Sequence, residues 1–300
     1  MMEAQSPFPE HYFERDGLKR HYVDEGHGDP VVMVHGNPSW SFAFRHLVTE
    51  LSRDHRTIVP DHIGCGLSDK PGDDRYRYTA ESRVADLTAL LDHLGIDSNV
   101  TLIVHDWGGM IGMGWAVRHI ERIARLVVLN TAAFRLPKAK RLPFALWLTR
   151  NTPLGTFLVR GFNAFARGTA RIGTKRAPMP QGVQEQYVAP YDSWAHRIAT
   201  LRFVQDIPLK PGDPSWPLLE EVEAGLEKLH DKPMWIGWGE RDFVFDRHFL
   251  EEWMRRFPRA EVHRFPDCGH YVFEDAREEI VRGIRAFVDA HPLTATSIAQ

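Results

Sequence analysis

The chain has 300 residues, of which 43% are hydrophobic and 11% aromatic, and its formal net charge is -3 at neutral pH. This composition supports one large domain or two of ordinary size, and the charge gives no general attraction to nucleic acid or to an anionic membrane. No apolar run reaches the roughly 18 residues of a membrane span. Two cysteines exclude a disulfide framework. Because no signal peptide is visible either, we expect a cytoplasmic protein.

The first 130 residues alternate between short apolar runs and amphipathic segments. A hairpin signal, Asp16-Gly17, separates the first two of six predicted strands. The strands are predicted at 12–15, 18–24, 31–34, 57–59, 101–104 and 126–129. Residues 79–94 are predicted to be helical, with Thr79 as the start and Gly95 as the end, and another helix runs to about His119. This alternation predicts a mostly parallel sheet flanked by helices, with the hairpin at one edge.

The alternation stops between residues 131 and 231, where proline-punctuated aromatic segments contain no good buried strand. It resumes with a strand at 234–238, a helix at 246–257, a strand at 260–265 and a helix at 275–288. We therefore predict a core domain made of residues 1–130 and 232–300. Residues 131–231 are predicted to form an inserted helical cap.

The strand at 101–104 runs straight into Asp106 and then into a helix. This is the setting of a nucleophile elbow, a tight turn that holds a nucleophile above the sheet beside a helix N-terminus. Aspartate replaces the usual serine, and Val104 replaces the first of the two small residues, while Gly108 keeps the second. A carboxylate attacks carbon without a base, although hydrolysis of the resulting ester does need one. The alternative role for Asp106 is a helix cap, which suits aspartate equally well.

A base and an acid follow later strands. His270 comes after the last predicted strand, and Asp242 comes just beyond the strand before it. Nucleophile, acid and histidine in this chain order, each at the C-terminal end of a strand, match the α/β-hydrolase fold. Glu240 and Asp246 are rival acids, but the first lies too close to the strand end and the second suits a helix N-cap. We therefore predict this fold, with Asp106, Asp242 and His270 as catalytic residues.

Two motifs give the sequence a family resemblance. HGNPSW at 35–40 and HDWGG at 105–109 resemble the haloalkane dehalogenases, and the resemblance covers essentially the whole chain. It implies that the side chains of Asn37 and Trp107 donate N–H groups to a leaving group, and both are donors by their chemistry. The alternative from the residues alone is that Asn37 is a turn residue before Pro38 and Trp107 a core aromatic, but their occurrence together in these motifs favours the functional role.

Within this family the sequence resembles the branch whose acid is placed as Asp242 is, because Asn130 occupies the acid position of the other branches. Segments 130–134, 187–192 and 205–209 further resemble the cis-β-lactone decarboxylases of bacterial long-chain olefin biosynthesis. The resemblance implies a small hydrophobic substrate, opened by the aspartate to give a cis-alkene and CO₂, or else a haloalkane hydrolysed to alcohol and halide. Which lactone carbon is attacked stays open. Other enzymes of the pathway are candidate partners, and a homo-oligomer is left open.

Two further functions are alternatives. An epoxide hydrolase would need cap tyrosines, for which Tyr187 and Tyr191 are available, but the residue after His35-Gly36 is then usually aromatic. A non-catalytic binding module would require a broken triad, and all three members are present. We expect no cofactor and no metal, because Gly64-Cys65-Gly66 lacks a third glycine and no histidines have ligand spacing. The cap is basic, which is typical of a solvated face or of a surface for an acidic partner protein.

Overall fold

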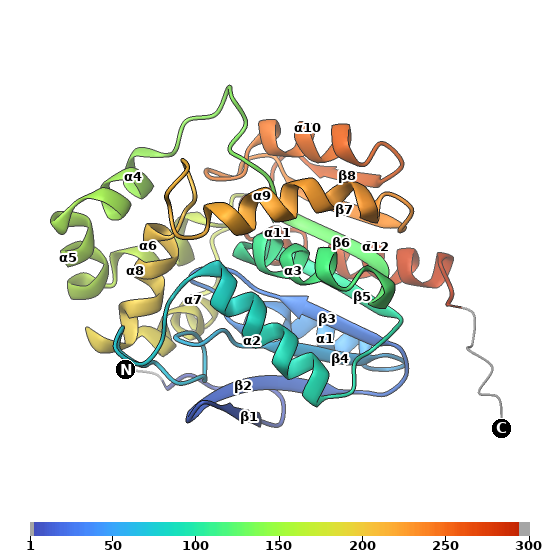
Figure 1. Ribbon diagram of the computed structural model, residues 1–300, viewed down its shortest axis with the longest axis horizontal. Helices are drawn as coiled ribbons and strands as arrows, with labels where there is room; N and C mark the ends of the chain where they lie inside the picture. Colours follow the sequence, from blue (N-terminus) through green and yellow to red (C-terminus); the bar gives the residue numbers. More distant parts are fainter. Residues whose placement is uncertain (1–2, 294–300) are drawn as a thin grey trace.

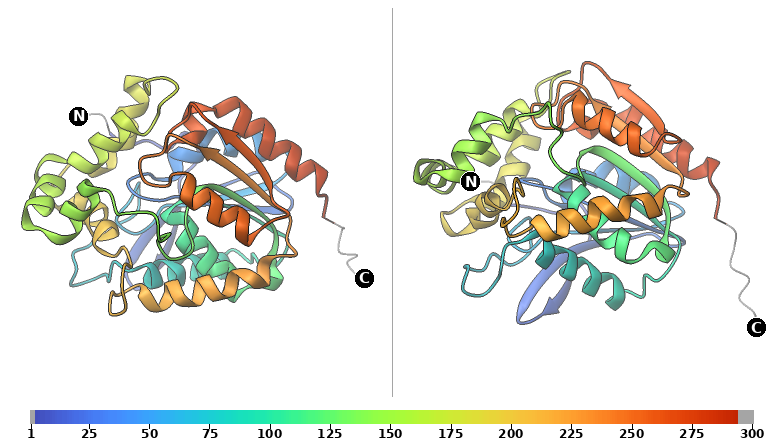
Figure 2. Two further views of the ribbon diagram at one scale, coloured as in Figure 1. Left: turned by 90° about the horizontal axis from the view of Figure 1, so that it is seen from above. Right: turned by 45° about the horizontal axis from the view of Figure 1, so that its top comes forward.

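The computed structural model describes residues 3–293, which form one eight-stranded sheet with helices on both faces (Figures 1 and 2). The strand order is β1-β2-β4-β3-β5-β6-β7-β8. The strands are β1 (His11–Arg15), β2 (Leu18–Glu25), β3 (Pro30–Val34), β4 (Arg56–Pro60), β5 (Val100–Asp106), β6 (Ile123–Thr131), β7 (Met234–Gly239) and β8 (Glu261–Phe265). Strands β1 and β2 are antiparallel to their neighbours, whereas β4, β3, β5, β6, β7 and β8 run parallel. The predicted α/β-hydrolase architecture is therefore confirmed.

Alternate residues of the central strands pack into two separate cores. On one face, Val32 and Leu102 pack with helices α2 (Ala80–His93), α3 (Trp107–Arg118), α9 (Trp216–Gly225) and α10 (Arg247–Arg256). On the other face, Val31 and Ile103 pack with α1 (Arg45–Leu51), α11 (Val272–Asp275) and α12 (Arg277–Ala290). Because successive side chains of a strand point to opposite faces, a strand that is apolar throughout can be buried on both sides. Strand β5 is buried at every residue. This burial holds Asp106 in a fixed position at the end of the strand.

Between β6 and β7 the described chain forms helices and no strand. Helices α4 (Phe144–Asn151), α5 (Pro153–Phe162), α6 (Ala164–Ile172), α7 (Gln181–Val188) and α8 (Ile198–Gln205) lie beyond the strand ends, at the left of Figure 1. Helix α9 returns to the sheet and packs against α3. The exact division into a core and a cap at residues 131–231 stays a prediction.

Most predicted boundaries hold within a few residues. Thr79 accepts a hydrogen bond from the Ser82 amide at 3.3 Å, and Gly95 has the left-handed φ of 67° that ends a helix. The predicted final helix at 275–288 corresponds to α12, whereas the four-residue helix α11 before it was not predicted. Helix α1 was not predicted at all, since its seven residues are too few for a clear helical period.

Candidate active site

Asp106 occupies a strained turn at the junction of β5 and α3. Its φ of 51° and ψ of -125° are unusual for a residue with a side chain, and such strain is found at functional sites. Glycines make this turn possible, since a side chain at Gly108 would collide with the Val34 carbonyl. The valine found where the motif has its first small residue is accommodated by α3, because Gly112 has no Cβ to clash with Val104.

The Asp106 carboxylate does not cap the helix that it precedes. Its Oδ1 atom instead accepts a hydrogen bond from the Asn37 amide at 2.6 Å, and the Trp107 amide also stabilises its charge. A Cβ at Gly36 would overlap the carboxylate, so only glycine fits beside it. Burial raises the pKa of Asp106, while the charge of His270 and the two amides oppose that rise. The capping alternative is therefore wrong, and Oδ2 is left facing the histidine.

His270 joins the predicted acid to the predicted nucleophile. Its Nδ1 lies 2.8 Å from Asp242 Oδ2, and its Nε2 lies 3.8 Å from Asp106 Oδ2. All three side chains are buried. Burial alone lowers the pKa of His270, but the charge and hydrogen bond of Asp242 and the charge of Asp106 outweigh it and raise the pKa overall. The three residues predicted to act together are thus in contact in the fold.

Asp242 is held by a residue whose contribution the sequence analysis missed. Asn130 donates to Asp242 Oδ2 at 3.0 Å, and its own side-chain oxygen accepts from the Gly239 amide at 2.8 Å. The rival acids are engaged elsewhere, since Asp246 accepts from the His248 amide at the start of α10 and Glu240 lies 3.5 Å from Arg264. Asn130 therefore bridges β6 to the loop after β7 and orients the acid without being anionic.

Asn37 and Trp107, the two predicted leaving-group donors, both line the cavity above Asp106. The side-chain Nδ2 of Asn37 donates one of its two N–H groups to the Thr200 carbonyl at 3.1 Å, which ties the loop to α8. The second N–H of this side chain makes no hydrogen bond within residues 3–293. The Trp107 indole N–H likewise makes no hydrogen bond to a described residue, while its ring packs against Phe203 at 5.4 Å. Each side chain therefore retains one N–H for a bound group.

The cavity has a volume of about 130 Å³ and lies between the strand ends and the helices of the cap. Its polar floor consists of Asn37, Asp106 and His270, and its walls are almost wholly apolar. Wall residues include Leu136, Leu146, Phe165, Val204, Leu209 and Phe245. The site therefore suits an apolar substrate with one reactive polar group.

Tyr187 and Tyr191 do not line this cavity, although both belong to the cap. Both are buried, and Tyr187 donates to Glu274 Oε1 at 2.8 Å while Tyr191 donates to the Ser39 carbonyl at 3.3 Å. Neither hydroxyl is placed to protonate a substrate oxygen above Asp106. The cap tyrosines, which were the sequence feature in favour of an epoxide hydrolase, therefore do not support that function in the folded protein.

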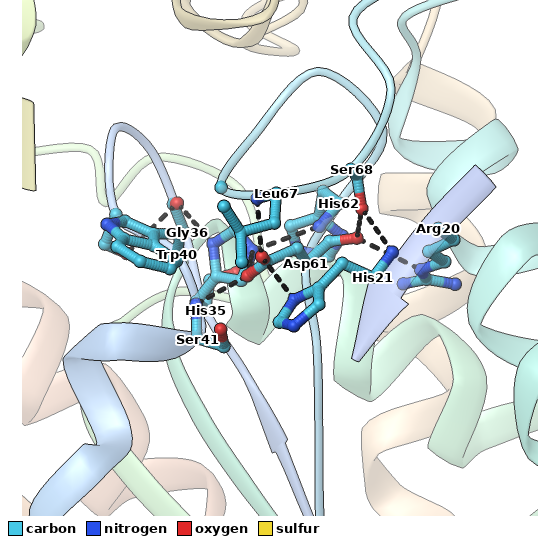
Figure 3. A network of polar contacts seen from close by, with 12 residues as sticks. Arg20, His21, His35, Gly36, Trp40, Ser41, Asp61, His62, Leu67 and Ser68 are labelled. Atoms are coloured by element: carbon cyan, nitrogen blue, oxygen red, sulfur yellow. Dashed lines mark hydrogen bonds and ion pairs between the residues drawn. The ribbon is translucent and has the colours of Figure 1, made fainter. Parts of the chain in front are cut away.

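A buried polar network holds the loop that carries Asn37 (Figure 3). At its centre, the Asp61 carboxylate accepts from the Ser41 amide at 2.6 Å, from the Leu67 amide at 2.9 Å and from His21 at 2.8 Å. Burial by itself raises the pKa of Asp61, but His21 and the amides lower it overall. A nearby imidazole, that of His35, is kept neutral because burial lowers its pKa to about 4. One anion thus ties two loops at the strand ends together.

Two kinds of feature are absent from residues 3–293. No helix there is long and apolar enough to cross a membrane. Nor do three or more histidine, cysteine, aspartate or glutamate side chains gather into a group that would hold a metal ion. Cys65 and Cys268 are both free and buried.

The geometry and a family comparison agree on the class of protein. A family model described as alpha/beta hydrolase fold matches residues 29–276, and the chain belongs to this family. Among solved structures, the haloalkane dehalogenase DatA from Agrobacterium tumefaciens C58 superposes with a TM-score of 0.84 at 25% identity, covering 95% of this chain and 97% of that one.

Similarity is much higher to two curated proteins. The chain is 57% identical to the cis-3-alkyl-4-alkyloxetan-2-one decarboxylase of Shewanella oneidensis, covering 99% of this chain and 94% of that protein. It is 52% identical to the protein of the same name from Xanthomonas campestris, covering 93% and 95%. A haloalkane dehalogenase from Mycolicibacterium paratuberculosis is 31% identical, covering 95% and 94%. The predicted resemblance to both groups is confirmed, with the decarboxylases the more similar.

Proposed function

We propose that this enzyme converts a cis-3-alkyl-4-alkyl-oxetan-2-one, a β-lactone with two alkyl arms, into a cis-alkene and CO₂. The proposal rests chiefly on one arrangement, a buried aspartate with two free N–H donors at the floor of an apolar cavity. The two decarboxylases at 57% and 52% identity support it. In this proposal the enzyme works in cytoplasmic olefin biosynthesis beside the enzyme that makes the lactone.

In the first step, Asp106 Oδ2 attacks ring carbon C4 and displaces the ring oxygen. A C4–O bond to Asp106 forms, the C4–O bond of the ring breaks, and the ring carbonyl becomes a carboxylate. The free N–H groups of Asn37 and Trp107 are placed to stabilise the negative charge that develops on this oxygen. During attack on C4 these N–H groups stabilise the departing oxygen as they would stabilise a departing halide, because in both cases the leaving atom departs in line from an sp³ carbon.

In the second step, the carboxylate leaves as CO₂. The bond between C3 and the carboxylate carbon breaks, its electrons form the C3–C4 double bond, and the C4–O bond to Asp106 breaks to restore the aspartate. The first step inverts C4, and an anti-elimination in the second returns the cis relation of the two alkyl arms to the alkene. No water and no proton transfer is needed, so His270 serves here in its protonated form, which balances the charge of Asp106 at 3.8 Å, whereas a hydrolytic reaction would use its neutral form.

A parallel assay of one purified sample tests the proposal. A dialkyl cis-β-lactone is scored for cis-alkene and CO₂, and a set of bromo- and iodoalkanes is scored for halide release. We expect efficient alkene formation and at most weak dehalogenation. Efficient halide release with no alkene would contradict the proposal and leave a haloalkane dehalogenase.

Haloalkane hydrolysis is the second candidate because the site retains a base. Neutral His270, oriented by Asp242, is placed to activate water against an ester on Asp106. Replacing His270 by Gln should therefore trap an alkyl ester on Asp106 when an iodoalkane reacts, and intact-mass analysis with peptide mapping would locate it. The same variant should still release alkene from the lactone, since that route needs no water. An adduct on any other residue would contradict the assignment of Asp106 as nucleophile.

A further inference from the structure

The cap has an outer surface that the proposed reaction does not use. Seven of the eight large hydrophobic residues that are exposed in the described chain lie between residues 144 and 194. Five of them belong to the consecutive helices α4 and α5, the outermost part of the cap in Figure 1. These are Phe144, Trp147, Leu154, Phe157 and Phe162, which are exposed by 73%, 47%, 56%, 52% and 58%. We call them the α4–α5 apolar surface.

The aromatic members of this surface are organised rather than scattered. Phe144 stacks on Trp147 with ring centroids 6.0 Å apart, and Phe157 meets Phe162 edge-on at 5.4 Å. Isolated exposed hydrophobic residues are normal, but a group gathered on two neighbouring helices marks an interaction site. The opposite face of α4 contributes Leu146 to the wall of the cavity. One helix therefore separates the cavity from this surface, and a helix with its side chains is about 10 Å thick.

The segment of the chain that contains this surface carries charge of one sign only. Between residues 131 and 184 the chain has ten lysines and arginines and no aspartate or glutamate, although the whole chain has 37 basic and 40 acidic residues. Four of the ten are paired with acids from elsewhere in the fold: Arg135, Lys140, Arg150 and Arg176. Lys138, Arg141, Arg167 and Arg171 are exposed and form no ion pair with any residue that the structure describes.

We propose that the α4–α5 apolar surface docks the enzyme on an anionic lipid membrane, with the unpaired lysines and arginines facing the lipid headgroups. Exposed aromatic side chains beside basic ones are the pattern of helices that lie in a membrane interface, where apolar burial and attraction to anionic lipids add together. A second copy of the chain fits less well. A two-fold contact would bring this surface against itself, and with it two segments that contain basic residues and no acid.

The advantage of docking for catalysis rests on the proposed function. A β-lactone with long alkyl arms and the hydrocarbon made from it are both nearly insoluble in water and partition into a bilayer. An enzyme held on the bilayer by α4 and α5 keeps its apolar cavity about one helix diameter from that phase. The membrane contact itself does not depend on which substrate is used.

Co-sedimentation with vesicles tests the docking without any substrate. The full-length protein is mixed with vesicles of phosphatidylglycerol or of phosphatidylcholine, and the bound fraction is measured at low and high salt. We expect binding to phosphatidylglycerol that weakens as salt rises, and at least roughly tenfold weaker binding to phosphatidylcholine. No binding of the wild type to phosphatidylglycerol, or equal binding to both lipids at all salt concentrations, would overturn the proposal.

Two variants locate the contact. The triple variant Phe144→Ser, Trp147→Ser, Phe157→Ser and the charge variant Lys138→Glu, Arg141→Glu, Arg167→Glu should each lower the partition coefficient by about tenfold or more. Controls are Tyr12→Ser, an exposed aromatic on β1, and the equally charged set Arg53→Glu, Lys228→Glu, Arg259→Glu on the sheet domain; these should bind as the wild type does. Unchanged binding in the cap variants would overturn the proposal.

Self-association provides a further check. Light scattering that showed a dimer in the wild type and a monomer in the triple Ser variant, together with no vesicle binding, would make the surface a contact between copies and overturn membrane docking. Failure of the proposed function looks different, since vesicle binding would persist while the lactone stayed intact. Circular dichroism of each variant shows that the fold is retained.

Discussion

The floor and the walls of the cavity are built in different ways. The floor includes Asp106 and His270, polar side chains that are fixed at the ends of parallel strands by a backbone amide and by Asp242, which Asn130 holds in turn. The walls are apolar side chains that come both from the cap and from helices and loops of the sheet domain. Directed hydrogen bonds fix positions sharply, whereas apolar packing accepts many sequences of similar volume. The floor therefore sets the chemistry, and the walls set which substrate reaches it.

The largest effect should come from removing the nucleophile. Asp106→Ala should lower alkene formation by roughly a thousandfold or more, because the covalent step disappears while the cavity remains. Initial rates of alkene release measure this, with Asp246→Asn as a control that removes a carboxylate outside the cavity. If Asp106→Ala kept a tenth of the wild-type rate, the division between a catalytic floor and a selective wall would be wrong.

A smaller loss should follow from replacing the acid. Asp242→Asn should slow haloalkane hydrolysis by about a hundredfold or more, while Glu240→Gln and Asp246→Asn stay within several-fold. Asp242 raises the pKa of His270, and the hydrolytic base must be neutral, so activity falls as the pH drops through that pKa. Without the Asp242 charge the pKa is lower, and this acidic limb of the pH profile should move to lower pH. A limb that did not move, or equal losses at all three positions, would show that the acid is misplaced.

The sequence predicted the floor much better than the walls. Asp106, Asp242 and His270 stand at strand ends in a fixed order, so a pattern of strands was enough to bring them together. Support for the acid from Asn130 was missed, because it depends on a left-handed φ of 32° at the end of β6 that no local pattern reveals.

The cap could be predicted only as a helical region rich in aromatic residues. Its short amphipathic helices pack on two sides, and the sequence does not show which side faces the cavity. Leu146 lines the cavity while Trp147, the next residue, lies on the exposed side of the same helix. The basic character of the cap was predicted from the sequence although the total charge is -3, because the excess of acidic residues lies in the rest of the chain.

Changing a wall should alter selectivity more than rate. Leu209 lines the cavity, and Leu209→Trp should take up space that would otherwise hold about two methylenes of an alkyl arm. At about 0.8 kcal/mol per buried CH₂, the preference for longer over shorter lactones should fall by roughly tenfold. Ratios of kcat/KM across a chain-length series measure this. Leu154→Trp, on the exposed face of α5, is the matched control and should leave the series unchanged. An equal loss of rate for every chain length would mean that Leu209 does not contact the alkyl arms.

The smallest effect on turnover should come from the cap tyrosines. Tyr187→Phe removes a hydroxyl that donates to Glu274 at 2.8 Å, but Glu274 keeps its ion pair with Arg45 at 2.6 Å and the tyrosine does not line the cavity. We therefore expect turnover within several-fold of the wild type and a free energy of unfolding lower by about 1 kcal/mol, measured by denaturant titration. Tyr191→Phe should behave in the same way, since its hydroxyl donates to a backbone carbonyl. A loss of a hundredfold in turnover with unchanged stability would place the hydroxyl in the reaction, as an epoxide-opening acid would be, and would extend the chemistry of the floor into the cap.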